Sequence, residues 1–255
     1  MSPEARPAPP FEPTVSVVMT TYDGAAFVAK AVASVLDQGH RGLELVVVDD
    51  GSRDATPAIL AGIAARDDRL RAFTAPHRGI AASRNQGLAM ARGRFIAFLD
   101  QDDLCPPDRI VRQHARLSAE SGLAALFGLT LMFERDEPQR PPPDGPLPDP
   151  ILTMLISTAL FRRDAIDAIG GFDPAYEIAD DFDFVLRLIE SGQRIEVEQA
   201  VGVFYRRHPG QRSADRAATR AECARALQRS LQRRRQLGIA GPLTHPLMRA
   251  GSPMP

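Results

Sequence analysis

Short apolar runs that end in acidic or hydroxyl residues, each followed by a segment with helical spacing, organise the amino-terminal part of the chain. β-Branched and other apolar residues fill the two clearest runs, at 15–20 and 43–48, as expected of buried strands. Apolar residues then recur at helical spacing over 26–36 and 55–65. Strand, polar turn and helix in repeated succession predict an α/β fold with a parallel sheet and right-handed crossovers.

A third apolar run, at 94–99, leads into the acidic cluster Asp100-Gln101-Asp102-Asp103. Side chains alternate along an extended chain, so Asp100 and Asp102 are expected on one side, with Asp103 just beyond. Mg²⁺ and Mn²⁺ prefer such oxygen ligands and commonly share them with substrate phosphates. The cluster therefore predicts a metal–diphosphate site, with a solvated loop that carries a helix-capping acid as the alternative.

The polar ends of these strands are expected to meet, because ligands of open parallel sheets bind beyond the carboxyl ends of the strands. A short strand at 71–73 and a helix over 80–91 complete this half of the sheet. The strand ends carry Thr20, Thr21, Tyr22, Asp23, Asp49, Asp50, Asp100, Gln101, Asp102 and Asp103. We expect them around a single crevice.

The second half of the chain has a less regular pattern. Strands are expected over 123–133 and 152–161, with an exposed, Pro-rich and charged loop over 134–150 between them. A short helix over 163–169 and a glycine-rich turn over 170–173 follow.

Two further helices are expected near the carboxyl end. Apolar residues at helical spacing over 182–189 predict a helix that begins at Asp180 and Asp181. The helix dipole favours acids at that end, so simple capping accounts for the pair as well as a functional role does. The segment 214–235 is basic and helical, with Ala224, Leu227 and Leu231 on one side and many arginines on the other. It is either a packing helix with a solvated face or a contact with an anionic membrane surface.

Composition excludes several classes of protein. The net charge of −1 gives no indication of nucleic-acid binding. Cys105 and Cys223 lie too far apart in sequence for a ligand motif, which favours a reducing compartment over a disulfide framework. No apolar stretch is long enough to span a bilayer, and the start lacks a signal-peptide core. We therefore expect a cytoplasmic protein with a Pro-rich, disordered leader over residues 1–13.

The order of these motifs resembles the metal-dependent, inverting family-two glycosyltransferases with a GT-A fold. The resemblance implies a single Rossmann-like GT-A domain over 14–213, with a mostly parallel sheet flanked by helices and a carboxyl-terminal helix and tail over 214–255. Within it, 14–104 would be the nucleotide-sugar half and 105–213 the acceptor half. The matching segments are Thr20-Thr21-Tyr22-Asp23, Asp49-Asp50, Arg84-Asn85-Gln86-Gly87, Asp100-Gln101-Asp102-Asp103, Asp180-Asp181 and Tyr205-Arg206-Arg207-His208.

The resemblance also implies a role for each matching residue. Asp181 would be the catalytic base, with Asp180 as the alternative. Asp102, Asp100 and His208 would hold Mn²⁺ or Mg²⁺. The nucleotide would be bound by Thr20, Thr21, Tyr22, Asp23, Asp50, Arg84, Asp100 and Gln101.

The implied reaction moves a sugar, typically a hexose, from a nucleotide-diphosphate sugar to a hydroxyl of a carbohydrate or lipid-linked acceptor, in the synthesis of cell-surface polysaccharide. Asp50 can accept a hydrogen bond from N3 of uracil, a donor that cytosine lacks, which favours UDP- or dTDP-sugars. Peripheral contact with the inner face of a membrane, through the basic helix, is a further expectation. The alternative function is a non-catalytic glycan- or nucleotide-binding or scaffolding relative, because a fold can survive the loss of its chemistry.

Overall fold

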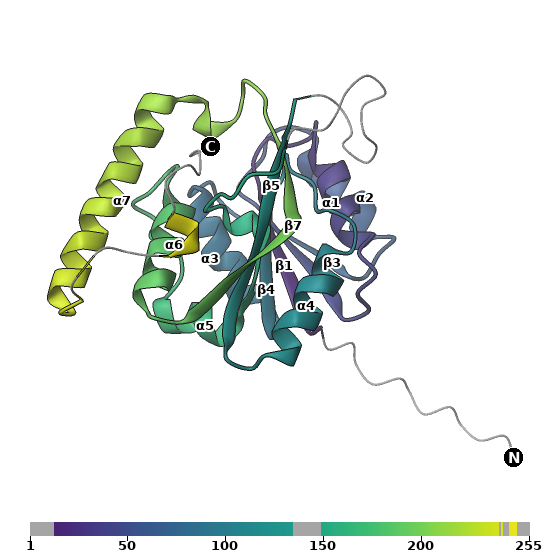
Figure 1. Ribbon diagram of the computed structural model, residues 1–255. Coiled ribbons are helices and arrows are strands. Elements are labelled where there is room, and N and C mark those ends of the chain that lie inside the picture. Colours follow the sequence, from purple (N-terminus) through teal and green to yellow (C-terminus); the bar gives the residue numbers. More distant parts are fainter. Residues whose placement is uncertain (1–12, 135–148, 240, 242–244, 249–255) are drawn as a thin grey trace, which may run out of the picture.

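A computed structural model describes residues 13–134, 149–239, 241 and 245–248, and its strands form one sheet (Figure 1). The strand order is β3-β2-β1-β4-β6-β5-β7. The first four are mutually parallel, β6 is antiparallel to both of its neighbours, and β5 and β7 are parallel. The strands are β1 (Val15–Thr21), β2 (Leu43–Asp49), β3 (Leu70–Thr74), β4 (Phe95–Asp100), β5 (Leu123–Phe133), β6 (Ala159–Arg162) and β7 (Arg194–Arg206).

Helices cover both faces of the sheet (Figure 1). Alternate residues of β1 enter two apolar cores: Val17 packs with residues of α1 and α4, whereas Val18 packs with residues of α3, α5 and α6. The helices are α1 (Val28–Leu36), α2 (Thr56–Ala64), α3 (Ile80–Met90), α4 (Arg109–Ala119), α5 (Arg163–Ile169), α6 (Asp180–Glu190) and α7 (Arg216–Gln236). The mostly parallel sheet flanked by helices is confirmed.

The register of the sheet brings the polar strand ends together as expected. Thr20 of β1 lies beside Asp100 of β4, and Thr21 lies beside Asp49 of β2. Helix α3 packs closely against these strands, since a Cβ atom on Gly87 would lie 2.4 Å from Cγ1 of Val18. Only glycine allows this approach, which sets the position of Arg84 one turn earlier.

The strand predicted over 152–161 is wrong in its first part. A 3₁₀ turn over Ile156–Thr158 precedes β6, which begins only at Ala159. The Thr158 hydroxyl donates to the carbonyl of Leu155, and the Thr153 hydroxyl bonds the Thr130 hydroxyl of β5. These hydroxyl bonds hold the backbone in a turn where apolar content alone suggested a strand.

Two long elements have no counterpart among the predicted ones, helix α4 and strand β7. Helix α4 buries Arg109 and Gln113, which donate to the carbonyls of Ala159 and Thr158. Strand β7 carries Glu196 and Glu198, which pair with arginines of α4. Arg109 and Gln113 are thus buried through partners distant in sequence, and Glu196 and Glu198 are partly buried against α4, which hides the usual apolar period of both elements.

Helix α7 forms where the sequence predicted it, but it packs through another side. The buried residues of α7 are Thr219, Cys223, Ala226, Ser230 and Arg234. Leu227 and Leu231 of the predicted apolar side are exposed. Among the described residues, every helix is too short or too polar to span a bilayer. The predicted leader and most of the predicted 134–150 loop lie outside the described residues.

Candidate active site

A cleft of about 990 Å³ lies beyond the carboxyl ends of β1, β2 and β4. Its other walls come from the segment before α6, the turn after β7 and one side of α7. The predicted site residues that line it are Thr20, Thr21, Tyr22, Asp50, Arg84, Asp100, Gln101, Asp102, Asp180, Asp181 and His208. Asp23 does not line the cleft.

Gln101 and Asp23 shape the turn after β1. The Thr21 hydroxyl and the amide N–H of Tyr22 both donate to Oε1 of Gln101, at 2.5 and 2.9 Å. Asp23 adopts a left-handed conformation (φ 47°), and its carboxylate accepts the N–H of Arg53 at 2.7 Å. Gln101 and the Asp23–Arg53 bond therefore hold this turn from two sides, and the Tyr22 ring lies at the surface of the cleft.

Asp50 organises the loop after β3. Its two carboxylate oxygens accept the N–H groups of Arg78 and Gly79, each at 2.9 Å. His77 Nδ1 lies 2.9 Å from Asp50 Oδ2, and the His77 ring stacks at a tilt on Tyr22, with 4.3 Å between the centroids. Gly79 has φ 86°, which suits glycine at this point before α3. Sequence reasoning missed His77, although the turn that contains it follows a predicted strand directly.

Arg84 bridges two carboxylates that are 80 residues apart in the sequence. Its Nη1 lies 2.6 Å from Asp180 and its Nη2 lies 2.8 Å from Asp100. Its side chain is only 3% exposed. Burial raises the pKa of Asp100, but the charges of Arg84 and Arg212 outweigh this and leave it below its ordinary value. Arg84 therefore connects β4 with the start of α6.

The two acids at the start of α6 occupy different surroundings. Asp180 is fully buried and is the one bound to Arg84. Asp181 lies beside it at the cleft, half-buried, without an arginine partner among the described residues. Burial, and then the negative charge of Asp180, raise the pKa of Asp181 to about 7. A carboxyl group with this pKa can take up a proton near neutral pH.

The acidic turn after β4 faces the turn after β7. Asp102 Oδ2 lies 2.9 Å from His208 Nε2. The Arg206 side chain donates to the carbonyl of Asp102, and the Arg206 N–H donates to the carboxylate of Asp103. Burial and neighbouring acids raise the pKa values of Asp102 and Asp103, and one buried oxygen of Asp103 has no hydrogen-bond partner among the described residues.

These residues fit a divalent cation whose coordination is completed by a substrate. Crowded carboxylates with raised pKa values are stabilised by a nearby positive charge. A carboxylate oxygen and an imidazole nitrogen suit Mn²⁺ or Mg²⁺. Within the described residues, no three His, Cys, Asp or Glu side chains form a complete metal site. Asp102 and His208 could therefore hold an ion only together with ligand oxygens, such as those of a diphosphate.

The wall opposite the strands was largely missed by sequence reasoning. It includes Met154, Tyr176, Phe182, Cys223 and Leu227. The sequence places Phe182 and Leu227 on helices but gives no sign that these residues face the cleft, because the wall forms only when α7 packs beside α6 (Figure 1). This wall is more apolar than the strand-end wall.

Comparison with known proteins shows extended similarity. Residues 16–170 match the family model described as "Glycosyl transferase family 2". The succinoglycan biosynthesis protein ExoO of Rhizobium meliloti is 32% identical over 265 residues, covering 89% of this chain and 74% of that protein. The putative teichuronic acid biosynthesis glycosyltransferase TuaG of Bacillus subtilis is 34% identical, over 50% of this chain and 51% of that protein.

Solved structures share the fold at lower identity. A mannosyltransferase from Pyrobaculum calidifontis, in complex with GDP-Man and Mn²⁺, has a TM-score of 0.67 and 21% identity, covering 96% of this chain and 70% of that one. TarS residues 1–349 from S. aureus, in complex with UDP-GlcNAc, has a TM-score of 0.61 and 23% identity, covering 79% of this chain and 61% of that one. At these identities the likeness shows the architecture.

Proposed function

The chain belongs to glycosyltransferase family 2 and has its GT-A fold, and from this we propose that it is a metal-dependent, inverting enzyme. It would transfer a sugar from a nucleotide-diphosphate sugar to a hydroxyl of a carbohydrate or lipid-linked acceptor, in cell-surface glycan synthesis. One observation carries the proposal: Tyr22 and Asp50, Asp102 and His208, and Asp181 all line the same cleft.

The nucleoside would bind between the turns after β1 and β3. Tyr22 and His77 offer ring faces for a base, and Asp50 holds the 77–79 loop beside them. The Asp50 carboxylate has one acceptor position left after its bonds to Arg78, Gly79 and His77. The N3–H group of uracil or thymine can donate a hydrogen bond to this position on Asp50, which supports a UDP- or dTDP-sugar as the sugar donor. We assign the acceptor to the half of the domain after residue 104.

The diphosphate would lie over the acidic turn, with Asp102 and His208 as the protein ligands of Mg²⁺ or Mn²⁺. A bound cation would neutralise the charge that develops on the departing diphosphate. Asp100 stands next to this position with one oxygen already held by Arg84.

Asp181 would act as the base. As the acceptor oxygen forms its bond to the anomeric carbon, the bond from that carbon to the diphosphate oxygen breaks and the hydroxyl proton passes to Asp181. A single displacement of this kind inverts the configuration. Asp180 forms a buried ion pair with Arg84, which favours Asp181 as the base.

Calorimetric titration with UDP, with and without Mn²⁺, tests the donor site. We expect metal-dependent binding that weakens by about tenfold or more in Asp102→Ala, which removes a cation ligand. Asp68→Ala, at an exposed acid that does not line the cleft, is the control and should bind as the wild type does. GDP binding in place of UDP would contradict the role of Asp50. A folded protein that binds no nucleotide diphosphate would favour the non-catalytic alternative.

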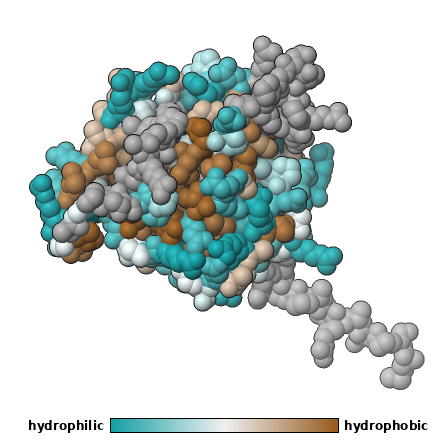
Figure 2. Space-filling view, in the orientation of Figure 1, coloured by the Kyte–Doolittle hydropathy of each residue, from teal (hydrophilic) through white to brown (hydrophobic). Residues whose placement is uncertain are grey.

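Contact of α7 with an anionic membrane is a second part of the proposal. Four of the six exposed large apolar side chains in the described residues lie on or just after α7, namely Leu227, Leu231, Leu237 and Ile239. Apolar surface is visible along this helix in Figure 2. Arg216, Arg220 and Arg235 are also exposed there. Apolar side chains among arginines suit the interface of an anionic bilayer.

Co-sedimentation with phosphatidylcholine vesicles, with and without phosphatidylglycerol, tests this contact. The bound fraction should require phosphatidylglycerol and fall with salt. Leu231→Asp should weaken binding by about fivefold or more, because a charge replaces an apolar contact. Val111→Asp, at an exposed apolar residue of α4, is the matched control. Binding that ignores anionic lipid content would contradict the proposal.

A further inference from the structure

The segment 173–179, which leads into α6, is held by α7. Glu222 of α7 accepts hydrogen bonds from three successive backbone N–H groups of this segment: those of Glu177, Ile178 and Ala179, at 3.1, 2.8 and 3.0 Å. All three bonds end on the same carboxylate oxygen, Oε2. The next residues in the chain are Asp180 and Asp181.

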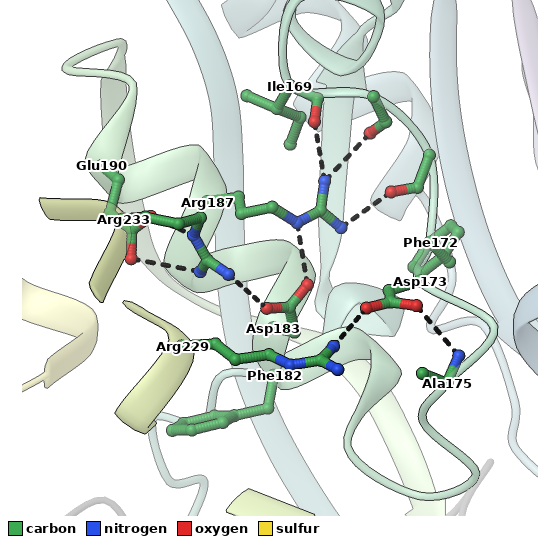
Figure 3. A network of polar contacts seen from close by, with 12 residues as sticks. Ile169, Phe172, Asp173, Ala175, Phe182, Asp183, Arg187, Glu190, Arg229 and Arg233 are labelled. Atoms are coloured by element: carbon green, nitrogen blue, oxygen red, sulfur yellow. Dashed lines mark hydrogen bonds and ion pairs between the residues drawn. The ribbon is translucent and has the colours of Figure 1, made fainter. Parts of the chain in front are cut away.

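Two arginines of α7 hold the earlier part of the same segment, and Figure 3 shows the contact of Arg229 with Asp173. Arg229 pairs with Asp173 at 2.5 Å, and Arg225 donates to the carbonyl of Ala175 at 2.8 Å. The guanidinium groups of Arg225 and Arg229 also lie over the Tyr176 ring, 4.7 and 5.2 Å from its centroid, respectively. The segment is therefore fixed at several successive residues by one helix.

Of the α7 side chains that bind this segment, Glu222 contacts the residues nearest in sequence to Asp181, and among the described residues no other acceptor is seen for the three N–H groups. Burial raises the pKa of Glu222, but the three N–H donors outweigh this and keep it below its ordinary value. Ala179 is buried and Ile178 partly buried, and N–H groups that lose their acceptor away from water are costly, so loss of the carboxylate would favour another path for the segment. Its side chain is 18% exposed and does not line the cleft.

We propose that Glu222 is a positioning residue that sets the placement of Asp181 in the cleft by holding residues 177–179. The inference rests on the proposed function, because it matters only if Asp181 acts on the acceptor. Misplacement of a reacting group by about 1 Å can lower a rate by about 10²-fold, so a contact through three backbone bonds has a measurable effect on turnover.

The test compares Glu222→Ala, Glu222→Gln and Glu190→Gln. Glu190 lies at the other end of α6 and pairs with Arg233 of α7 at 2.8 Å, so its variant loosens the same pair of helices away from the segment (Figure 3). Turnover is read as UDP release from the UDP-sugar that the wild type hydrolyses fastest, with its pH profile. Amide hydrogen exchange over 177–181 and UDP–Mn²⁺ affinity are measured beside it.

Glu222→Ala should lower kcat about 10- to 100-fold, shift the pH midpoint of kcat and speed amide exchange over 177–181 by about tenfold or more, with UDP–Mn²⁺ affinity unchanged. Glu222→Gln keeps one acceptor oxygen and should recover part of the rate. Glu190→Gln should keep kcat and the exchange of this segment.

Normal turnover and exchange in Glu222→Ala, beside a wild type that binds UDP and hydrolyses the donor, would overturn this inference alone. Equal losses in Glu190→Gln and Glu222→Ala would also overturn it, because they would mark a general packing effect. A wild type that binds no UDP would overturn the proposed function, and this inference with it.

Discussion

Asp181→Asn should lower sugar transfer by about 10²- to 10⁴-fold and leave the affinity for UDP and Mn²⁺ close to that of the wild type. The amide cannot accept the proton of the acceptor hydroxyl, and general base catalysis contributes a factor of this size. Asparagine has nearly the same shape, so the start of α6 should keep its fold. Steady-state kinetics together with calorimetry would separate the loss of chemistry from a loss of binding.

The pH profile gives an independent check on the same residue. A carboxylate base works only when deprotonated, and the pKa of Asp181, the proposed base, is raised to about 7. The wild-type kcat should therefore rise about tenfold per pH unit below 7 and level off above it. In Asp181→Asn this dependence should vanish along with most of the rate. Normal turnover in Asp181→Asn would move the base to another residue.

Arg84→Met should lower the free energy of unfolding by about 3–5 kcal/mol. The variant leaves Asp180, which is fully buried, without its cationic partner, and Asp100 loses the same partner. Removing one side of a buried ion pair costs this much because the remaining charge stays out of water. Urea denaturation at neutral pH measures the loss. The loss should shrink at low pH, where protonation of the two acids removes the uncompensated charge.

Two further variants test whether the loss of stability in Arg84→Met comes from the buried, two-sided ion pair. Arg84→Lys keeps the charge but lacks the planar fork that reaches two carboxylates, so its stability should fall between those of the wild type and Arg84→Met. Arg69→Met breaks a partly exposed pair with Asp67 and should cost about 1 kcal/mol or less. Equal losses of unfolding free energy in Arg69→Met and Arg84→Met would contradict the larger contribution of the buried Arg84 ion pairs to stability.

Arg84 also changes how the sequence motif Arg84-Asn85 is understood. The family resemblance implies that Arg84 binds the nucleotide, but both ion pairs of Arg84 described above are with acids of the protein. Asn85 accepts the N–H of Phe172 and donates to its carbonyl, at 2.7 and 2.8 Å. Both residues thus tie α3 to the segment that leads to Asp181. A contact of Arg84 with the donor stays a prediction, which donor affinity in Arg84→Lys would test.

The parts of the fold that follow local rules could be predicted from the sequence. Residues 15–20, 43–48 and 94–99 are apolar runs of strand length, and each ends in the polar residues that line or shape the cleft. Parallel strands place their carboxyl ends at one edge of the sheet. The position of the cleft could therefore be predicted from the strand and helix patterns and from the parallel topology that they require. The position of Asp180 and Asp181 at a helix start also followed from local spacing.

The assignment of roles within that crevice depended on contacts between residues far apart in sequence. No residue close to Asp180 in the sequence indicates that Asp180 forms an ion pair with Arg84, or that Asp181 is the more accessible of the two acids. Nothing near Leu227 and Leu231 indicates that α7 packs through Cys223 and Ala226 instead. Ion pairs of Arg229 and Arg233 with Asp173, Asp183 and Glu190 favour that orientation (Figure 3).

The α/β architecture, the family and the edge of the sheet that carries the cleft could therefore be predicted from local sequence patterns. Which acid is paired with Arg84, which acid has a raised pKa and which side of α7 holds the segment before α6 become visible only in the folded protein. The physical reason is range: strand and helix periods are set by neighbours along the chain, whereas the pKa and position of a buried carboxylate are set by whatever the fold packs against it.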